Sequence, residues 1–95
     1  MYAIVCFDRP GSGALRDQHR DAHQKFLGEN SEMILFGGPL KETPEGPSTG
    51  ALIVVDCATR ADAEAFIAAD PFYRGGVYET VSVRAFKQVF PRARS

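Results

Sequence analysis

The chain has little cysteine, no tryptophan and no long apolar run, and these absences exclude several classes of protein. Its two cysteines, Cys6 and Cys57, have neither the CxxC spacing of a redox motif nor the spacing of a zinc site, so we expect buried free thiols. No apolar stretch approaches the roughly 20 residues that cross a bilayer. The residues up to Phe7 lack a basic region and begin a strand pattern, so we expect no signal peptide and a cytoplasmic protein.

An excess of charge of either sign is also missing. Eleven basic and twelve acidic residues give a formal net charge of -1, so no general positive field draws in a nucleic acid. Arg16 and Arg20 lie four residues apart on a predicted helix and could meet a small anion, although exposed arginines are more often simply solvated. With 44% apolar and 24% charged residues, the sequence fits one globular domain over residues 1–95.

The hydrophobic pattern predicts four strands and two helices. A continuous apolar run from Tyr2 to Phe7 indicates the first strand, and turn residues end it. Apolar residues at spacings of three and four then indicate an amphipathic helix. Thr59, with Asp62 three residues later, is typical of a second helix start. The predicted strands cover residues 2–7, 33–36, 51–55 and 80–90, the helices cover residues 14–30 and 60–70, and a long Pro/Gly-rich loop covers residues 40–49.

The element order, β-α-β-β-α-β, predicts an α+β fold of the ferredoxin-like or split βαβ type. In this fold a four-stranded antiparallel sheet carries both helices on one face. The last predicted strand has apolar residues on both of its faces, with Phe86 and Phe90 on the side opposite Val83. Because an apolar sheet face does not tolerate water, we expect a homodimer that packs through the uncovered face of the sheet.

His23 is the first candidate for chemistry. It precedes Phe26 and Leu27 by three and four residues, which places it at the border of the packed helix face, and histidine titrates near neutral pH. Asp70 ends the second predicted helix, and in this fold it can approach the flank of the first helix, where a carboxylate would orient the imidazole. A histidine at the border of a helix face is also often structural or merely exposed, so the spacing leaves both interpretations open.

Two longer stretches resemble the YCII (YciI-like) family. The first runs from Arg20 to Leu27 (RDAHQKFL) and continues from Ile34 to Leu40 (ILFGGPL), which is similar to the family's histidine on the first helix and its Gly-Pro after the second strand. The second, from Ala68 to Tyr73 (AADPFY) and from Gly76 to Phe86, resembles the Asp-Pro-aromatic motif and the closing strand. The resemblance therefore spans nearly the whole chain in the right order.

The resemblance implies a dimeric, α/β-barrel-like assembly related to muconolactone isomerase, and a His-Asp site that falls on His23 and Asp70 by motif position. The opening from Asp8 to Ser12 and the pair Leu15-Arg16 are similar to members that remove chloride from a chlorinated hydroxyhydroquinone in aromatic degradation. We therefore expect a lyase, a dehydrochlorinase or an isomerase that acts on a small aromatic or dienolic compound.

In this hypothesis His23 takes a hydroxyl or carbon-bound proton, Asp70 holds the imidazole, and Arg20 or Arg16 steadies the developing oxyanion. Loss of chloride by this route needs no cofactor. His19 and His23 have the i, i+4 spacing of half a zinc site, but the chain has no third histidine and no obvious third ligand beside them, so we expect no metal.

Three further residues are candidates for substrate binding. Asp8 ends the first strand and could enter the same cleft, although Asp before Pro-Gly is usually turn chemistry. Gly38, beside Gly37 and Pro39, could present a backbone N–H to a substrate or could simply satisfy an unusual backbone angle. Tyr73 could line the pocket or cover the exit of the second helix.

Two other functions fit the same sequence. The first is a non-catalytic, dimeric module that holds a metabolite or a partner protein in the same cleft. The second is a cofactor-free monooxygenase of the dimeric ferredoxin-like kind. Binding without product formation would indicate the module, and oxygen consumption with a quinol would indicate the monooxygenase.

Overall fold

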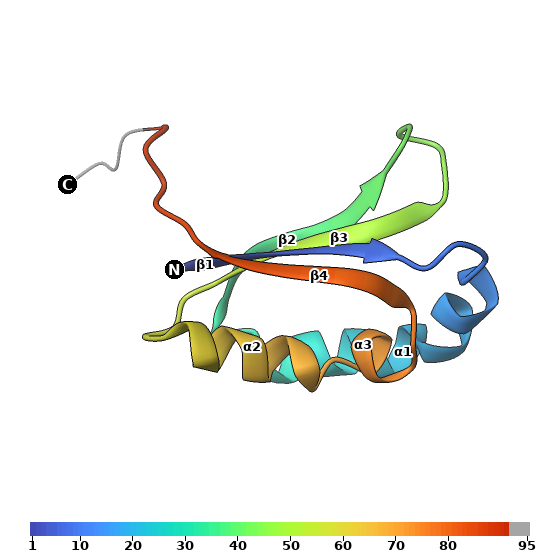
Figure 1. Ribbon diagram of the computed structural model, residues 1–95, viewed down its shortest axis with the longest axis horizontal. Coiled ribbons are helices and arrows are strands. Elements are labelled where there is room, and N and C mark those ends of the chain that lie inside the picture. Colours follow the sequence, from blue (N-terminus) through green and yellow to red (C-terminus); the bar gives the residue numbers. More distant parts are fainter. Residues whose placement is uncertain (92–95) are drawn as a thin grey trace.

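The computed structural model describes residues 1–91 and confirms the ferredoxin-like element order, in a single sheet of strand order β2-β3-β1-β4 (Figure 1). All three strand pairs are antiparallel. The elements are β1 (Tyr2–Asp8), α1 (Gly13–Glu29), β2 (Ile34–Lys41), β3 (Ser48–Val55), α2 (Arg60–Ala68), α3 (Pro71–Arg74) and β4 (Tyr78–Ala85).

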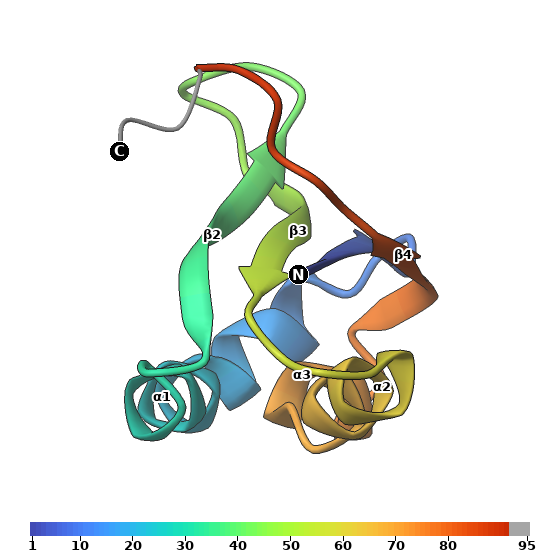
Figure 2. The ribbon, with the colours of Figure 1, turned by 90° about the vertical axis from the view of Figure 1, so that its left-hand side faces the viewer.

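The helices form one layer against one face of the sheet, as Figures 1 and 2 show from two directions. Between the layers, Ile4 and Cys6 of β1 are fully buried against the apolar face of α2, which contributes Phe66 and Ile67. Burying each large apolar side chain contributes roughly 1.5–3 kcal/mol. This core therefore holds the helix layer against the sheet, with α1 and α2 side by side.

The structure corrects several predicted boundaries. β2 continues through the two glycines and Pro39 to Lys41, because it is an edge strand, where a missing N–H is tolerated. β3 already begins at Ser48, so the expected long loop shrinks to residues 42–47. β4 ends at Ala85 rather than residue 90, and Phe90 lies outside the strand with its side chain exposed.

The second predicted helix is in fact two. α2 ends at Ala68, and the single turn α3 begins at Pro71, whose fixed φ suits the first helical position. The Thr59 hydroxyl caps α2 by accepting a hydrogen bond from the Asp62 N–H at 3.1 Å, as the sequence predicts. Ser12 sits before α1 but makes no capping hydrogen bond through its side chain.

An irregularity where β1 meets β4 turns Tyr78 toward the core. The register shifts between Phe7 and Asp8, so that Asp8 pairs with Tyr78 and the intervening Glu79 stays exposed. Bulges of this kind redirect side chains near functional sites. Here the shift buries the Tyr78 side chain on the same side of the sheet as the helices.

The other sheet face carries apolar side chains that the helices do not cover. Phe7 on β1 and Phe36 on β2 are 54% and 49% exposed, and both alternate with residues that face the helices. No helix within residues 1–91 is long and apolar enough to cross a membrane.

Candidate active site

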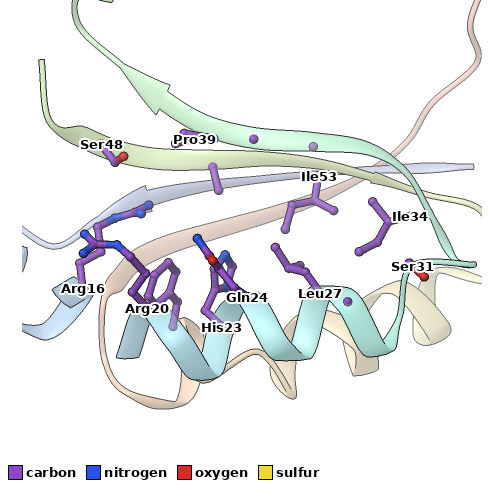
Figure 3. A pocket seen from close by; sticks show the side chains of 15 residues that line it. Arg16, Arg20, His23, Gln24, Leu27, Ser31, Ile34, Pro39, Ser48 and Ile53 are labelled. Atoms are coloured by element: carbon purple, nitrogen blue, oxygen red, sulfur yellow. The ribbon is translucent and has the colours of Figure 1, made fainter. Parts of the chain in front are cut away.

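A pocket of about 510 Å³ lies between α1 and the strands β2 and β3, as Figure 3 shows. This volume is in the range of sites for small molecules. The residues that line it are Arg16, Arg20, His23, Gln24, Leu27, Gly28, Ser31, Ile34, Gly37, Gly38, Pro39, Ser48, Ala51, Ile53 and Phe72. The pocket therefore combines one face of α1 with the helix-facing side of β2 and β3.

His23 and Asp70 are in contact on the wall of this pocket. His23 Nδ1 lies 2.7 Å from Asp70 Oδ1, and the Asp70 side chain is fully buried while the His23 side chain is 12% exposed. An ionised carboxylate only accepts hydrogen bonds, so Nδ1 carries the proton and donates it to Asp70. The Nε2 of a neutral His23 is then left with a lone pair that can accept a proton.

The backbone around Asp70 fixes its carboxylate. Asp70 caps α3, since its Oδ1 accepts a hydrogen bond from the Phe72 N–H at 2.9 Å. Its Oδ2 accepts a longer hydrogen bond, of 3.5 Å, from the Tyr78 hydroxyl. The residue that caps α3 is thus also the residue that orients His23, because the same Oδ1 meets both the Phe72 N–H and His23 Nδ1.

Phe72 fixes the plane of the His23 ring. The two rings stack with their centroids 3.9 Å apart and an interplanar angle of 12°. Phe72 is itself buried and meets Tyr78 edge-on, at 6.0 Å and 84°. Sequence reasoning did not give Phe72 a role, although its place in the Asp-Pro-aromatic motif, directly after the capping turn, is the signal that could have found it.

Arg16 is held firmly beside this cluster. Its Nε donates to Asp8 Oδ2 at 2.7 Å and its Nη2 donates to the Gly50 carbonyl at 2.9 Å, while the guanidinium lies 4.7 Å from the centre of the Phe72 ring. The side chains of Arg16 and Asp8 are only 11% and 9% exposed. Arg20 differs, because its ion pair with Asp17 lies on the surface, with 49% of the Arg20 side chain exposed.

The structure brings together most of the residues proposed from the sequence. Arg16, Arg20, His23 and Gly38 line the pocket, and Asp70 lies directly behind His23. Asp8 does not line the pocket, since its carboxylate is turned toward Arg16.

Tyr73 lies elsewhere and does not line this pocket. On the single turn of α3, Phe72 points inward and Tyr73, one residue later, points outward and is 46% exposed. Tyr73 instead lines a second hollow, between α2 and β4, together with Arg60 and Arg84.

The apolar half of the pocket is not evident from the sequence. Leu27, Ile34 and Ile53 have the pattern of core positions of a helix and two strands. They line a cavity together with Gly37, which pairs with Ile53 and therefore leaves β2 without a side chain on the face toward α1. A glycine at a strand position that faces a helix is the signal that could have revealed this space.

Two buried groups near Asp70 stay neutral at physiological pH. Burial, followed by the negative charge of Asp70, raises the pKa of the Cys6 thiol to about 12. The same two causes, in the same order, raise the pKa of the Tyr78 hydroxyl well above its usual value, so Tyr78 remains a hydrogen-bond donor. Among residues 1–91, no three His, Cys, Asp or Glu side chains gather as metal ligands would.

Comparisons with known proteins identify a family and close similarity in sequence length. The family model described as the YCII-related domain matches residues 1–87. The chain is 31% identical to Protein YciI of Escherichia coli O6:H1 and of Shigella flexneri, over 95% of this chain and 99% of each relative.

A solved structure is also similar over nearly the whole chain. It is the 5-chloro-2-hydroxyhydroquinone dehydrochlorinase TftG of Burkholderia phenoliruptrix AC1100, in complex with 2,5-dihydroxybenzoquinone. The match has a TM-score of 0.87 at 25% identity and covers 97% of this chain and 98% of TftG.

Proposed function

Since the chain belongs to the YCII-related domain family, we propose that it is a cofactor-free enzyme that moves a proton on a small aromatic or dienolic compound. The observation that carries this proposal is the contact between His23 and the fully buried Asp70 on the wall of a pocket of suitable size. A base whose tautomer is held by a carboxylate is the arrangement that general acid–base catalysis uses.

The catalytic step begins with a substrate hydroxyl next to His23. Nε2 of His23 accepts the hydroxyl proton, and Asp70 stabilises the imidazolium through the hydrogen bond to Nδ1. The negative charge that develops on the substrate oxygen is stabilised by Arg16 or Arg20, which line the same pocket.

The finer proposal is the elimination of HCl from a chlorinated hydroxyhydroquinone, and the similarity to TftG supports it. In this reaction the imidazolium returns its proton to the ring carbon that bears chlorine, which becomes tetrahedral. A second ionised hydroxyl then forms a carbonyl and expels chloride with its bonding electrons, leaving a hydroxyquinone. The net change is the loss of one proton and one chloride, so the reaction needs no electron acceptor.

Turnover by the purified protein tests the proposal. We expect chloride release and a new quinone absorbance from a chlorinated hydroxyhydroquinone, at equal stoichiometry and without oxygen consumption. Saturable binding of these compounds with no product would instead indicate a metabolite-binding module of the same fold. Oxygen uptake with a quinol would indicate a monooxygenase.

We also propose that the protein is a homodimer assembled through the sheet face opposite the helices. The exposed Phe7 and Phe36 on that face support this, because large exposed apolar side chains are unfavourable in water. The pocket lies on the helix side of the sheet, so the dimer would leave the His23 wall in place.

A further inference from the structure

The pocket is cationic at one end and mainly apolar at the other. Figure 3 shows Arg16, Arg20 and Ser48 at one end, and Leu27, Ile34 and Ile53, with Ser31 beside them, at the other. His23 and Gln24 lie between these ends. None of the described residues that line the pocket is an Asp or a Glu, so the charged groups on its wall are cationic.

Arg16 is organised before any ligand arrives. Its Nε and Nη2 are bound to Asp8 and the Gly50 carbonyl, and the Phe72 ring supports the plane of the guanidinium. Because the side chain is already immobilised, it loses little conformational entropy when it binds a ligand. A cationic side chain that its neighbours already hold in place binds an oxygen anion more tightly than a mobile cationic side chain does.

One nitrogen of Arg16 remains available. Nη1 makes no hydrogen bond to residues 1–91. It is also not a buried orphan, since among the buried side-chain N and O atoms described only Asp8 Oδ1 lacks a partner. A group that is neither bonded nor buried, on a residue that lines the pocket, is accessible to a ligand.

Arg20 is built differently at the same end of the pocket. Its guanidinium pairs with Asp17, three residues earlier on α1, and both side chains are largely exposed. Exposed ion pairs of this kind contribute little, and the long side chain must be ordered before it can bind. Arg20 can therefore assist an anion but does not define its position.

We infer that Arg16, of the two arginines on the pocket wall, forms an anion subsite that holds an anionic oxygen substituent of the substrate distinct from the group whose proton His23 transfers. Arg20 is then the arginine left to stabilise the charge that develops at that group. The substrate class is then a small ring with an acidic substituent at one end and an apolar substituent, facing Leu27, Ile34 and Ile53, at the other. This inference rests on the proposed function for its reaction, but it is tested by binding alone. The anionic oxygens belong either to a carboxylate or to an acidic hydroxyl that is ionised at neutral pH.

Two probes of similar shape but different charge show whether the charge of the ligand determines its affinity. 2,5-Dihydroxybenzoate and its neutral amide, 2,5-dihydroxybenzamide, differ mainly in charge, and calorimetry at pH 7 measures the dissociation constant of each. We expect the carboxylate to bind tenfold or more tightly, as a charge-assisted hydrogen bond to a fixed guanidinium would give. 4-Nitrocatechol, whose colour reports ionisation, tests the hydroxyl source. If the carboxylate and the amide bind equally but ionised 4-nitrocatechol binds more tightly than its neutral form, the anion that Arg16 holds is an ionised hydroxyl. Equal binding of neutral and ionised forms of both probes overturns the inference.

The variants locate the effect. Arg16→Gln alone would leave the carboxylate of Asp8 buried without its partner, so the informative variant is the double change Asp8→Asn/Arg16→Gln, which removes both charges together. We expect the preference for the anion to fall to within threefold in the double variant. Arg74→Gln removes an exposed arginine outside the pocket and should leave the preference unchanged. An unchanged preference in the double variant overturns the assignment to Arg16.

Failure of this inference differs from failure of the proposed function. If chloride release is absent while the anion preference and its loss in the double variant are observed, the subsite stands and the reaction is wrong. If turnover is normal but neutral and ionised forms of both probes bind equally, the reaction stands and the subsite is wrong.

Discussion

His23 Nδ1 lies 2.7 Å from Asp70 Oδ1, although 47 residues separate them in the sequence. The contact exists because Asp70 caps α3, two residues after the end of α2, and its buried carboxylate lies against the flank of α1. Phe72, two residues further along, stacks on the imidazole and fixes its plane. The turn from Asp70 to Phe72 therefore supplies both the hydrogen bond and the ring stacking that orient the His23 imidazole, and Nε2 is the nitrogen left for proton transfer.

Removal of the imidazole should abolish turnover without unfolding the protein. We expect His23→Ala to lower kcat by about 10²–10⁴, the usual contribution of a positioned general base or acid. The variant should still fold but melt at a lower temperature, because it loses the stacking on Phe72 and leaves the buried Asp70 carboxylate with only the Phe72 N–H and the Tyr78 hydroxyl as partners. The control is His19→Ala, which removes the other histidine of α1, whose ring lies beside Gly75 and outside the pocket. Unchanged kcat in His23→Ala would falsify the proposed mechanism.

The conservative change Asp70→Asn separates orientation from structure. The amide oxygen can still accept from the Phe72 N–H, so α3 keeps its cap and the variant should fold. The neutral amide does not stabilise an imidazolium, so we expect kcat to fall about a hundredfold or more, with a smaller effect on KM. Steady-state kinetics on the folded variant, verified by circular dichroism, measure this. A loss of activity that only follows a loss of thermal stability would point to a structural role alone.

The sequence predicted the element order, and its pattern of apolar residues was sufficient because the core is regular. The stripe of α1 and the alternation of β1 follow directly from helix and strand periods. The length of β2 was underestimated because glycines and Pro39 normally end strands, and only its edge position permits them. Local patterns contain no information on edge or centre, so that boundary required the sheet order.

The candidate site was predictable only in part, for a similar reason. His23 and Asp70 were found because a titratable group at a helix border and an Asp before Pro stand out locally. Tyr73 lies outside the pocket because of the way α3 is rotated about its axis. A helix of one turn is too short to show that rotation as a periodic pattern in the sequence. The ion pair between Asp8 and Arg16 joins the end of β1 to the start of α1. It could not be predicted, because only the path of the loop between the two elements brings the two side chains together.

Two glycines in neighbouring strands should respond oppositely to a methyl group. A Cβ at Gly50 would overlap the Cys6 carbonyl oxygen, which belongs to the backbone and cannot move without breaking the β1–β3 pairing. We expect Gly50→Ala to reduce the free energy of unfolding by about 2 kcal/mol or more. Gly38→Ala, on β2, meets nothing within 4 Å and should be neutral or slightly stabilising. Chemical denaturation of both variants measures the difference, and similar values for the two would contradict the close approach of β1 to β3 at Gly50.

Stability should decrease at alkaline pH through Cys6. Burial raises the pKa of its thiol from 9.0 to about 12 in the folded protein, so the folded state holds a proton that the unfolded state releases. The contribution is complete below pH 9 and is lost as pH rises from 9 to about 12, the same direction as for Tyr78. Denaturation curves across this range should therefore show a steep decline in wild type and a shallower one in Cys6→Ala. Parallel profiles for the two proteins would show that Cys6 does not cause the decline.

The sheet face should control the oligomeric state. Phe36 is 49% exposed on the face away from the helices, and Tyr73 is 46% exposed on the helix layer, so the two aromatic residues differ in their layer and not in their exposure. A carboxylate placed in an apolar interface must be desolvated without a partner, so Phe36→Glu should weaken a dimer through this face at least a hundredfold. Tyr73→Glu introduces the same charge outside the interface and should leave the dimer intact. Light scattering coupled to size-exclusion chromatography at micromolar concentrations distinguishes the species. A monomeric wild type, or a dimer that Tyr73→Glu disrupts and Phe36→Glu does not, would move the interface away from this face of the sheet.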